Sequence, residues 1–165
     1  MRFYERLEIK NAIAYLKIIF NNNDNPSFER SISNPTRGVG EKTLGKIRQT
    51  AQKYNISYIK ASAKLIDEGS ISGRGGSGLR DYLEFVAGCK SFIEENSLSD
   101  LMELIIKESG LYSYHAKEAG EKGKTRTENL EELITATKNF EQSIKEEKTN
   151  TEIAENYLDV ISLDA

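Results

Sequence analysis

The stretch that decides the fold covers residues 35–47 and has the sequence PTRGVGEKTLGKI. It has the layout of a helix-hairpin-helix turn: a helix, a Gly-apolar-Gly hairpin, and a second helix with apolar residues at fixed offsets. Gly38 and Gly40 allow positive φ and remove side chains, so a phosphate group can approach the backbone amides at the start of the second helix. We therefore expect an anion-binding turn in which Val39 packs inward.

Side chains around this turn predict contacts to the phosphate backbone of a nucleic acid. Arg37, Lys42 and Thr43 add two positive charges and a hydroxyl group at its rim. Such contacts position a protein on nucleic acid but do not identify bases. The alternative interpretation is a plain interhelical turn in which the glycines end a helix.

The distribution of charge favours the nucleic-acid interpretation. The chain has 165 residues, a formal net charge of -3 and a mean hydropathy of -0.56. Residues 34–60 nevertheless carry six basic residues and one acidic residue, a net charge of +5, whereas residues 121–165 carry six basic and eleven acidic residues, a net charge of -5. A basic segment in an acidic protein is a candidate binding surface, and the acidic segment is typical of a solvated exterior.

The spacing of apolar residues outside the turn predicts an all-α protein, a compact multi-helix domain. Asn25 is the expected N-cap of a helix with Pro26 in its first turn, and Ser97 that of a later helix. Glycine-rich loops are expected at residues 69–78 and 120–124. We expect helices over residues 5–21, 26–33, 41–54, 57–67, 79–93, 98–109, 111–116, from 125 or 127 to about 144, and 151–163.

Nothing in the sequence predicts a membrane span, an exported protein or a catalytic centre. No apolar run is long enough to cross a bilayer, and the charged N-terminus is unlike a signal peptide. A single cysteine, Cys89, indicates a reducing, cytoplasmic compartment and is expected in the core. His115 is the only histidine. We expect it to be a packed or surface residue, and we expect no metal or cofactor.

Residues 120–125, GEKGKT, imitate the phosphate-binding loop of nucleotide hydrolases. The full pattern needs a glycine where this chain has Glu118, and it needs a preceding buried strand, so we exclude that assignment. Lys122, Lys124 and Arg126 instead predict a second set of phosphate contacts near the start of the following helix. A solvated loop with an ordinary N-cap remains the alternative.

Three separated segments resemble one family. They are residues 2–16, which include RFYERLEIK and AYL, residues 34–40, NPTRGVG, and residues 120–133, GEKGKTRTENLEEL. In order and spacing they resemble the 2B subdomain of the UvrD/Rep/PcrA-type superfamily 1 DNA helicases, and the UvrD type most nearly. Residues 157–163, YLDVISL, resemble the re-entry into the second motor domain, so the resemblance covers nearly the whole chain. Asn11 stands where the family usually has aspartate.

The resemblance implies that residues 1–165 form a single helical accessory (2B-like) subdomain of a longer protein, with residues 1–20 and 150–165 near the junctions to motor domain 2A. The implied parent hydrolyses ATP with Mg, moves 3′ to 5′ on single-stranded DNA and unwinds duplexes in nucleotide excision and mismatch repair. Its motor motifs are expected outside this chain, which implies no catalysis and no cofactor here.

The resemblance also implies a role for this subdomain and its partners. Such subdomains swivel, contact the duplex ahead of the fork and regulate unwinding. The implied partners are DNA without sequence specificity, the motor domains of the same chain and repair proteins, with no membrane. An alternative is a protein-interaction or autoinhibitory module that docks on the motor domains or a repair partner; a free-standing helix-hairpin-helix repair protein is a third hypothesis. The family motifs place the duplex-facing positions at Thr36, Arg37, Gly38, Val39, Gly40, Gly123, Lys124, Thr125 and Arg126.

Overall fold

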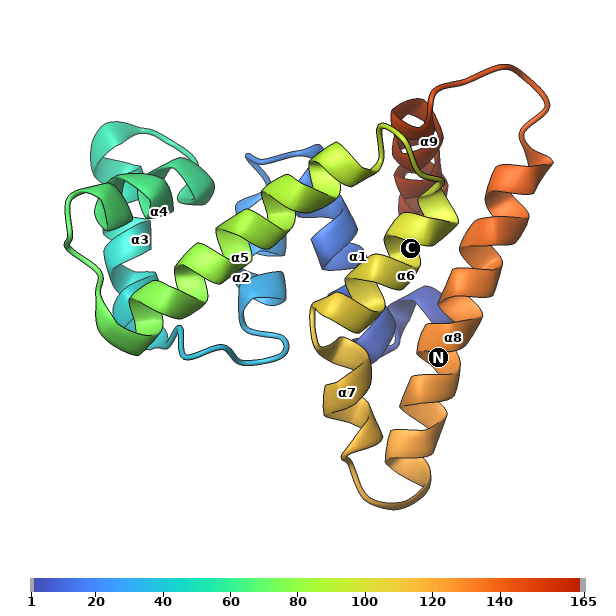
Figure 1. The fold of residues 1–165 in the computed structure, drawn as a ribbon, viewed down its shortest axis with the longest axis horizontal. Helices are drawn as coiled ribbons and strands as arrows, with labels where there is room; N and C mark the ends of the chain where they lie inside the picture. The colour runs from blue at the N-terminus through green and yellow to red at the C-terminus, as the bar shows by residue number, and fades with distance from the viewer. Residues whose placement is uncertain (1, 164–165) are drawn as a thin grey trace.

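The computed structural model describes residues 2–163, and within them it contains helices and no strand (Figure 1). The all-α prediction is confirmed. Met1, Asp164 and Ala165 belong to the predicted junction ranges and lie outside the described residues. The elements are η1 (Phe3–Glu5, a 3₁₀ helix), α1 (Leu7–Phe20), α2 (Asn25–Ile32), α3 (Glu41–Tyr54), α4 (Tyr58–Asp67), α5 (Gly73–Phe92), α6 (Leu98–Glu108), α7 (Leu111–Ala116), α8 (Gly120–Ser143) and α9 (Asn150–Leu163).

Helix α1 is the centre of the fold. Its apolar residues from Ile9 to Ile19 are at most 4% exposed, as expected for a helix that is apolar on all sides. It contacts α2, α5, α6, α8 and α9. Helices drawn from both halves of the chain therefore share one core built around the first long helix.

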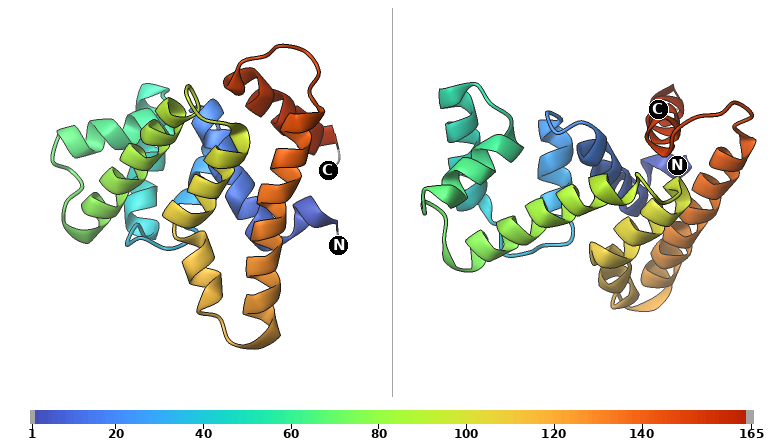
Figure 2. Two further views of the ribbon diagram at one scale, coloured as in Figure 1. Left: turned by 45° about the vertical axis from the view of Figure 1, so that its right-hand side comes forward. Right: turned by 45° about the horizontal axis from the view of Figure 1, so that its top comes forward.

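Helix α5 joins two groups of helices. Figure 1 shows α3 and α4 on the left, α6 to α9 on the right, and α5 running from the first group towards the second. Figure 2 shows the same division from two other directions. Leu79, Tyr82 and Val86 are buried along α5, and their spacing of three and four residues puts them on one face of the helix that was expected over residues 79–93.

Helix α2 begins one residue earlier than expected and has a different N-cap. The carboxylate of Asp24 accepts hydrogen bonds from the Ser27 backbone N–H at 3.1 Å and from the Ser27 hydroxyl at 2.7 Å. Asn25, the predicted cap, instead accepts a hydrogen bond from the backbone N–H of Tyr58 at 3.1 Å. Asn25 therefore connects α2 to α4, a contact between distant segments that the local pattern did not reveal.

Both glycine-rich segments that were expected as loops are largely helical. Helix α5 begins at Gly73, so the predicted loop of residues 69–78 is wrong beyond Ser72. Helix α8 begins at Gly120, so the predicted loop of residues 120–124 is wrong, and the helix starts before Thr125 and Thr127, the two expected starting points. Within these helices, Gly78 and Gly123 each lie where the backbone of a preceding segment passes close by.

Cys89 lies inside the core with 1% of its surface exposed, which confirms its expected position. Burial raises the pKa of its thiol to about 12, so the thiol stays protonated near neutral pH. Within residues 2–163, no helix combines the length and the apolar character that a membrane span requires.

Candidate nucleic-acid interface

The predicted hairpin is the connection of residues 34–40 between α2 and α3, and Tyr15 of α1 anchors its first residue. The Tyr15 hydroxyl donates a hydrogen bond to the backbone carbonyl of Asn34 at 2.8 Å. The Asn34 side chain donates to the carbonyl of Arg30 at 2.8 Å. The hairpin therefore leaves α2 from a position fixed by the central helix.

Arg37 points into the fold. Its Nε donates to the carbonyl of Ile32 at 3.2 Å, and its Nη2 donates to the Tyr15 hydroxyl. The guanidinium carbon lies 5.8 Å from the centre of the Tyr15 ring and 5.4 Å from that of Tyr82, two fully buried rings. A cation over aromatic faces is attracted by their negative charge density. The side chain of Arg37 thus ties the hairpin to the core in this structure.

The start of α5 packs directly against the hairpin backbone. A Cβ atom on Gly78 would lie 2.0 Å from the carbonyl oxygen of Arg37 and 3.4 Å from Cγ2 of Val39. A Cβ on Gly75 would lie 3.1 Å from Oγ1 of Thr43 and 3.5 Å from the carbonyl oxygen of Gly38. Since no larger side chain fits at Gly78, this glycine fixes how closely α5 supports the turn.

The outer side of the hairpin is open to solvent. Gly38 has a positive φ of 80° and is exposed, as are Thr36, Gly40 and Lys42, whereas Val39 is buried as predicted. No side chain caps the N-terminus of α3 at Gly40. The first backbone N–H groups of a helix have no partner within the helix and carry partial positive charge. This turn can therefore accept a phosphate oxygen at the predicted place.

Arg74 lies on the same exposed side of the hairpin, although no sequence pattern pointed to it. A Cβ on Gly38 would lie 2.8 Å from Cγ and 3.2 Å from Nε of Arg74, so the arginine stem runs along the hairpin at Gly38. Arg74 is exposed and belongs to the first turn of α5. Residues 69–78 were expected to form a loop, so Arg74 was not among the predicted contacts. The three-residue spacing of Gly75 and Gly78 nevertheless indicated one face of a helix that packs closely against another segment.

The second predicted region lies in the first turns of α8. Lys122, Lys124 and Thr125 are exposed there, whereas Gly123 is buried. A Cβ on Gly123 would lie 2.4 Å from the carbonyl oxygen of Glu118 and 2.7 Å from that of His115. Gly123 thus lets α8 approach the end of α7. The exposed Lys122 and Lys124 lie on the first turns of α8, whose N-terminus has no side-chain cap.

Arg126 turns inward to a network of polar side chains. Its Nη1 donates to both carboxylate oxygens of Glu118, at 3.0 and 3.2 Å, and its Nε lies 3.9 Å from Oε1 of Glu8. Glu118 also lies 2.5 Å from Nδ1 of His115, which is 3% exposed. Glu8, 4% exposed, accepts a hydrogen bond from the Asn129 amide at 2.8 Å. His115 is therefore packed, one of the two positions that were expected for it, and Arg126 connects α8 to α1.

This network predicts a pH dependence of stability. Hydrogen bonds from His115 and Arg126 hold the pKa of Glu118 below its ordinary value near 4.5, although burial opposes them. Because the folded pKa is lowered, the stabilisation is complete above about pH 4.5 and is lost as pH falls through the lower, folded value. The Glu118→Gln variant should therefore be less stable than the wild type at about pH 6, and the difference should shrink towards about pH 3.

Urea unfolding of both proteins across this pH range measures the effect. Glu121→Gln is the matched control, since Glu121 is exposed on the first turn of α8. A difference that stays constant from about pH 6 to about pH 3 contradicts the assigned role of Glu118.

The two predicted regions belong to different groups of helices. Figure 1 shows the connection of residues 34–40 on the lower side of the left-hand group and the turn between α7 and α8 at the bottom of the right-hand group. A Cβ on Gly110, just before α7, would lie 3.2 Å from Cγ of Pro35. The hairpin therefore touches the start of the short helix that leads to the basic turn of α8.

Comparison with known proteins gives a consistent result. Residues 1–73 match the UvrD-like helicase C-terminal domain. The chain is 41% identical over 147 residues to DNA helicase II of Escherichia coli, which is 89% of this chain and 20% of that protein. It is 33% identical over 146 residues to the ATP-dependent DNA helicase PcrA of Leuconostoc citreum, which is 88% of this chain and 20% of that protein. The chain thus spans about a fifth of the length of these relatives.

Proposed function

This chain is homologous to the UvrD-type DNA helicases, and we propose that it serves such an enzyme as a 2B-like accessory subdomain that contacts duplex DNA and regulates unwinding. The proposed parent couples ATP hydrolysis to 3′ to 5′ movement and acts in nucleotide excision and mismatch repair. The matched stretch of about 147 residues is 20% of each of these relatives, so the relatives are more than four times as long as this chain. The motor therefore belongs, in this proposal, to other parts of the protein, and this chain carries no catalysis.

The solvent-exposed hairpin carries the proposal. It combines an uncapped N-terminus of α3, exposed Gly38 and Gly40, and the cations Lys42 and Arg74 on two adjacent helices. Backbone amides, a helix dipole and flexible cations contact phosphates without regard to base sequence. A helicase needs this kind of contact, because it must hold any duplex that it meets.

We include Lys122, Lys124 and Thr125, which are exposed on the first turns of α8, in the proposed surface. The guanidinium groups of Arg37 and Arg126 bind inside the fold, so we do not expect them to contact phosphates directly. These two residues instead contribute their backbone to the surface and hold the two turns in place. The exposed lysines and Arg74 then make the charge contacts. A surface with so few phosphate contacts should bind weakly, with a Kd of roughly 10⁻⁴ to 10⁻⁶ M at physiological salt.

The ends of the described chain support the proposed junction to a motor domain. The hydroxyl groups of Tyr4 and Tyr157 lie 2.9 Å apart, and α9 packs on α1. Figure 2 shows both ends on the same side of the molecule. A subdomain whose two connections lie side by side can be inserted into another domain and can rotate about that connection.

Charge reversal tests the DNA contact. For the Lys42→Glu/Arg74→Glu variant we expect binding to a labelled duplex to weaken roughly 10- to 100-fold at low salt, and the slope of log K against log salt to fall by about 2, one unit for each lost phosphate contact. Fluorescence anisotropy at several salt concentrations measures both quantities. Arg37 is left unchanged, because reversing its charge would place a carboxylate among Tyr15, Tyr82 and the Ile32 carbonyl.

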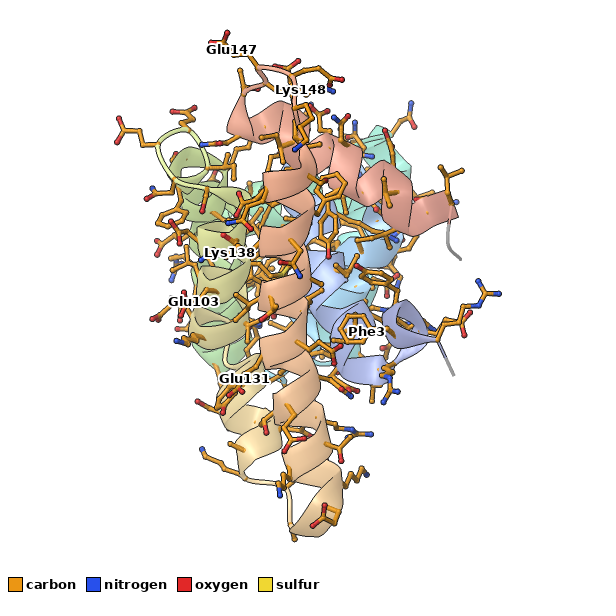
Figure 3. All side chains as sticks on the ribbon, turned by 90° about the vertical axis from the view of Figure 1, so that its right-hand side faces the viewer. Phe3, Glu103, Glu131, Lys138, Glu147 and Lys148 are labelled. Atoms are coloured by element: carbon orange, nitrogen blue, oxygen red, sulfur yellow. The ribbon has the colours of Figure 1, made fainter. Side chains whose placement is uncertain are left out.

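The matched control is Lys138→Glu/Lys145→Glu, which changes the net charge by the same amount. Both lysines are exposed, and Lys138 stands on the middle of α8, as Figure 3 shows. This control should bind the duplex like the wild type. If it weakens binding as much as the hairpin variant does, total charge governs the affinity and the hairpin is not the contact.

A further inference from the structure

One carboxylate stands inside the basic segment of residues 34–60. It belongs to Glu41, the single acidic residue of that segment and the first residue of α3, directly after the exposed Gly40. A carboxylate in the first turn of a helix is attracted to the free backbone N–H groups there. These are the same groups that the proposed phosphate contact needs. Left unrestrained, the side chain of Glu41 would therefore compete with a phosphate and repel it.

Arg48 binds this carboxylate from further along α3. Its Nη1 donates a hydrogen bond to Oε1 of Glu41 at 2.6 Å. Arg48 follows Glu41 by about two helical turns and therefore lies on the same face of α3. Because helical side chains lean towards the N-terminus, the long arginine reaches back to meet the carboxylate. The hydrogen bond thus directs the side chain of Glu41 along the helix and away from its start.

Glu29 of α2 fixes the position of Arg48. Its Oε1 accepts a hydrogen bond from Nε of Arg48 at 3.1 Å and another from Nη2. The planar guanidinium group thus engages two carboxylates at once, with Nε and Nη2 on Glu29 and Nη1 on Glu41. Since α2 and α3 are the two helices that the hairpin connects, Arg48 is held by one side of the hairpin and acts on the other.

We propose that Arg48 is a positioning residue of the DNA contact: it holds the Glu41 carboxylate away from the N-terminus of α3, so that the backbone N–H groups there and Lys42 stay available to a phosphate. This inference rests on the proposed function, because it concerns the same turn. It adds to that function a device that neutralises the one carboxylate beside the phosphate position. Lysine cannot replace Arg48 in this role, because an ammonium group lacks the fork that engages Glu29 and Glu41 together.

The exposure of these three side chains favours a role in binding over a role in folding stability. The side chains of Arg48 and Glu29 are 37% and 34% exposed, and that of Glu41 is 78% exposed. Ion pairs that are so open to water contribute little to the free energy of unfolding. Loss of the Arg48 side chain should therefore affect duplex binding clearly while it changes Tm only slightly.

A double-mutant cycle on duplex binding tests this role. Arg48→Gln should weaken binding to a labelled duplex about fivefold at low salt, the effect of one unbalanced charge a few ångströms from a phosphate in water. In the Glu41→Gln background the same change should cost less than about twofold, because no carboxylate remains to be held. Arg48→Lys, which keeps the charge, should still weaken binding while Glu41 is present. Fluorescence anisotropy measures these affinities, and thermal unfolding checks that each variant is folded.

Lys138→Gln is the matched control, since it removes one positive charge from an exposed position in the middle of α8. It should bind the duplex like the wild type, with or without Glu41→Gln. Equal costs of Arg48→Gln in the two backgrounds would overturn the positioning role, because Arg48 would then act through its own charge or through the fold. The proposed function would survive that result if Lys42→Glu/Arg74→Glu still weakens binding. Failure of the wild type to bind the duplex would overturn both.

Discussion

Replacing Gly78 by alanine should destabilise the protein by about 3 kcal/mol, since overpacking against a fixed backbone forces that backbone to move. The added Cβ would lie 2.0 Å from the carbonyl oxygen of Arg37. This clash can be relieved only if the hairpin moves away from α5. Such a movement is costly, because Tyr15, Tyr82 and the carbonyl of Ile32 hold the Arg37 side chain in place. Thermal unfolding should show a Tm lower by roughly 6–12 °C.

Gly88→Ala is the matched control on the same helix. Gly88 is exposed in the interior of α5, and nothing lies within 4 Å of the position of an added Cβ. Alanine there should stabilise the protein by about 0.5–1 kcal/mol, because it favours the helical conformation. Duplex binding should weaken in Gly78→Ala and stay unchanged in Gly88→Ala. Equal stability of the two variants would contradict the close packing of α5 on the hairpin.

Replacing Glu8 by alanine should cost about 3 kcal/mol, because it leaves buried polar groups without their partner. Glu8 and Asn129 are 4% and 9% exposed, and their hydrogen bond of 2.8 Å joins α1 to α8 across 121 positions of sequence. The same carboxylate lies 3.9 Å from Nε of Arg126. Its loss should therefore loosen the helix that carries the proposed lysine contacts.

A double-mutant cycle with Asn129→Ala separates this bond from general disruption. The Glu8→Ala/Asn129→Ala protein should be more stable than the sum of the single changes predicts, by about 1 kcal/mol or more. Urea unfolding of the four proteins gives this coupling energy. Glu5→Ala is the control. Glu5 is exposed, and its ion pair with Arg2 is long, at 4.0 Å, so this change should alter the free energy of unfolding by less than about 0.5 kcal/mol. A coupling energy near zero would mean that the two residues act independently.

The sequence predicted most helices correctly because their determinants are local. Ser97 caps α6 by accepting a hydrogen bond from the Asp100 backbone N–H at 3.1 Å, as its position before an apolar run indicated. The apolar periodicity of α5 from Leu79 onward matched its buried face. Both features involve residues within a few positions of one another, so no tertiary information was needed to find them.

The starts of α5 and α8 could not be predicted in the same way. Glycine is a poor helix former, so residues 73–78 and 120–124 were expected to be loops. In the structure Gly78 faces the carbonyl of Arg37, and Gly123 faces those of His115 and Glu118. These glycines are explained by close contact with another segment, and that contact is invisible until the chain has folded.

What the sequence by itself determined is the set of helices, the hairpin of residues 34–40 with its buried Val39, and the two basic segments that form the candidate interface. Only the tertiary structure decided the direction of each charged side chain: Arg37 and Arg126 bind inside the fold, whereas Lys42 and Arg74 face solvent. The physical reason is that a guanidinium group enters the interior only where other segments supply aromatic faces, carbonyls or carboxylates, and those partners come from distant parts of the chain.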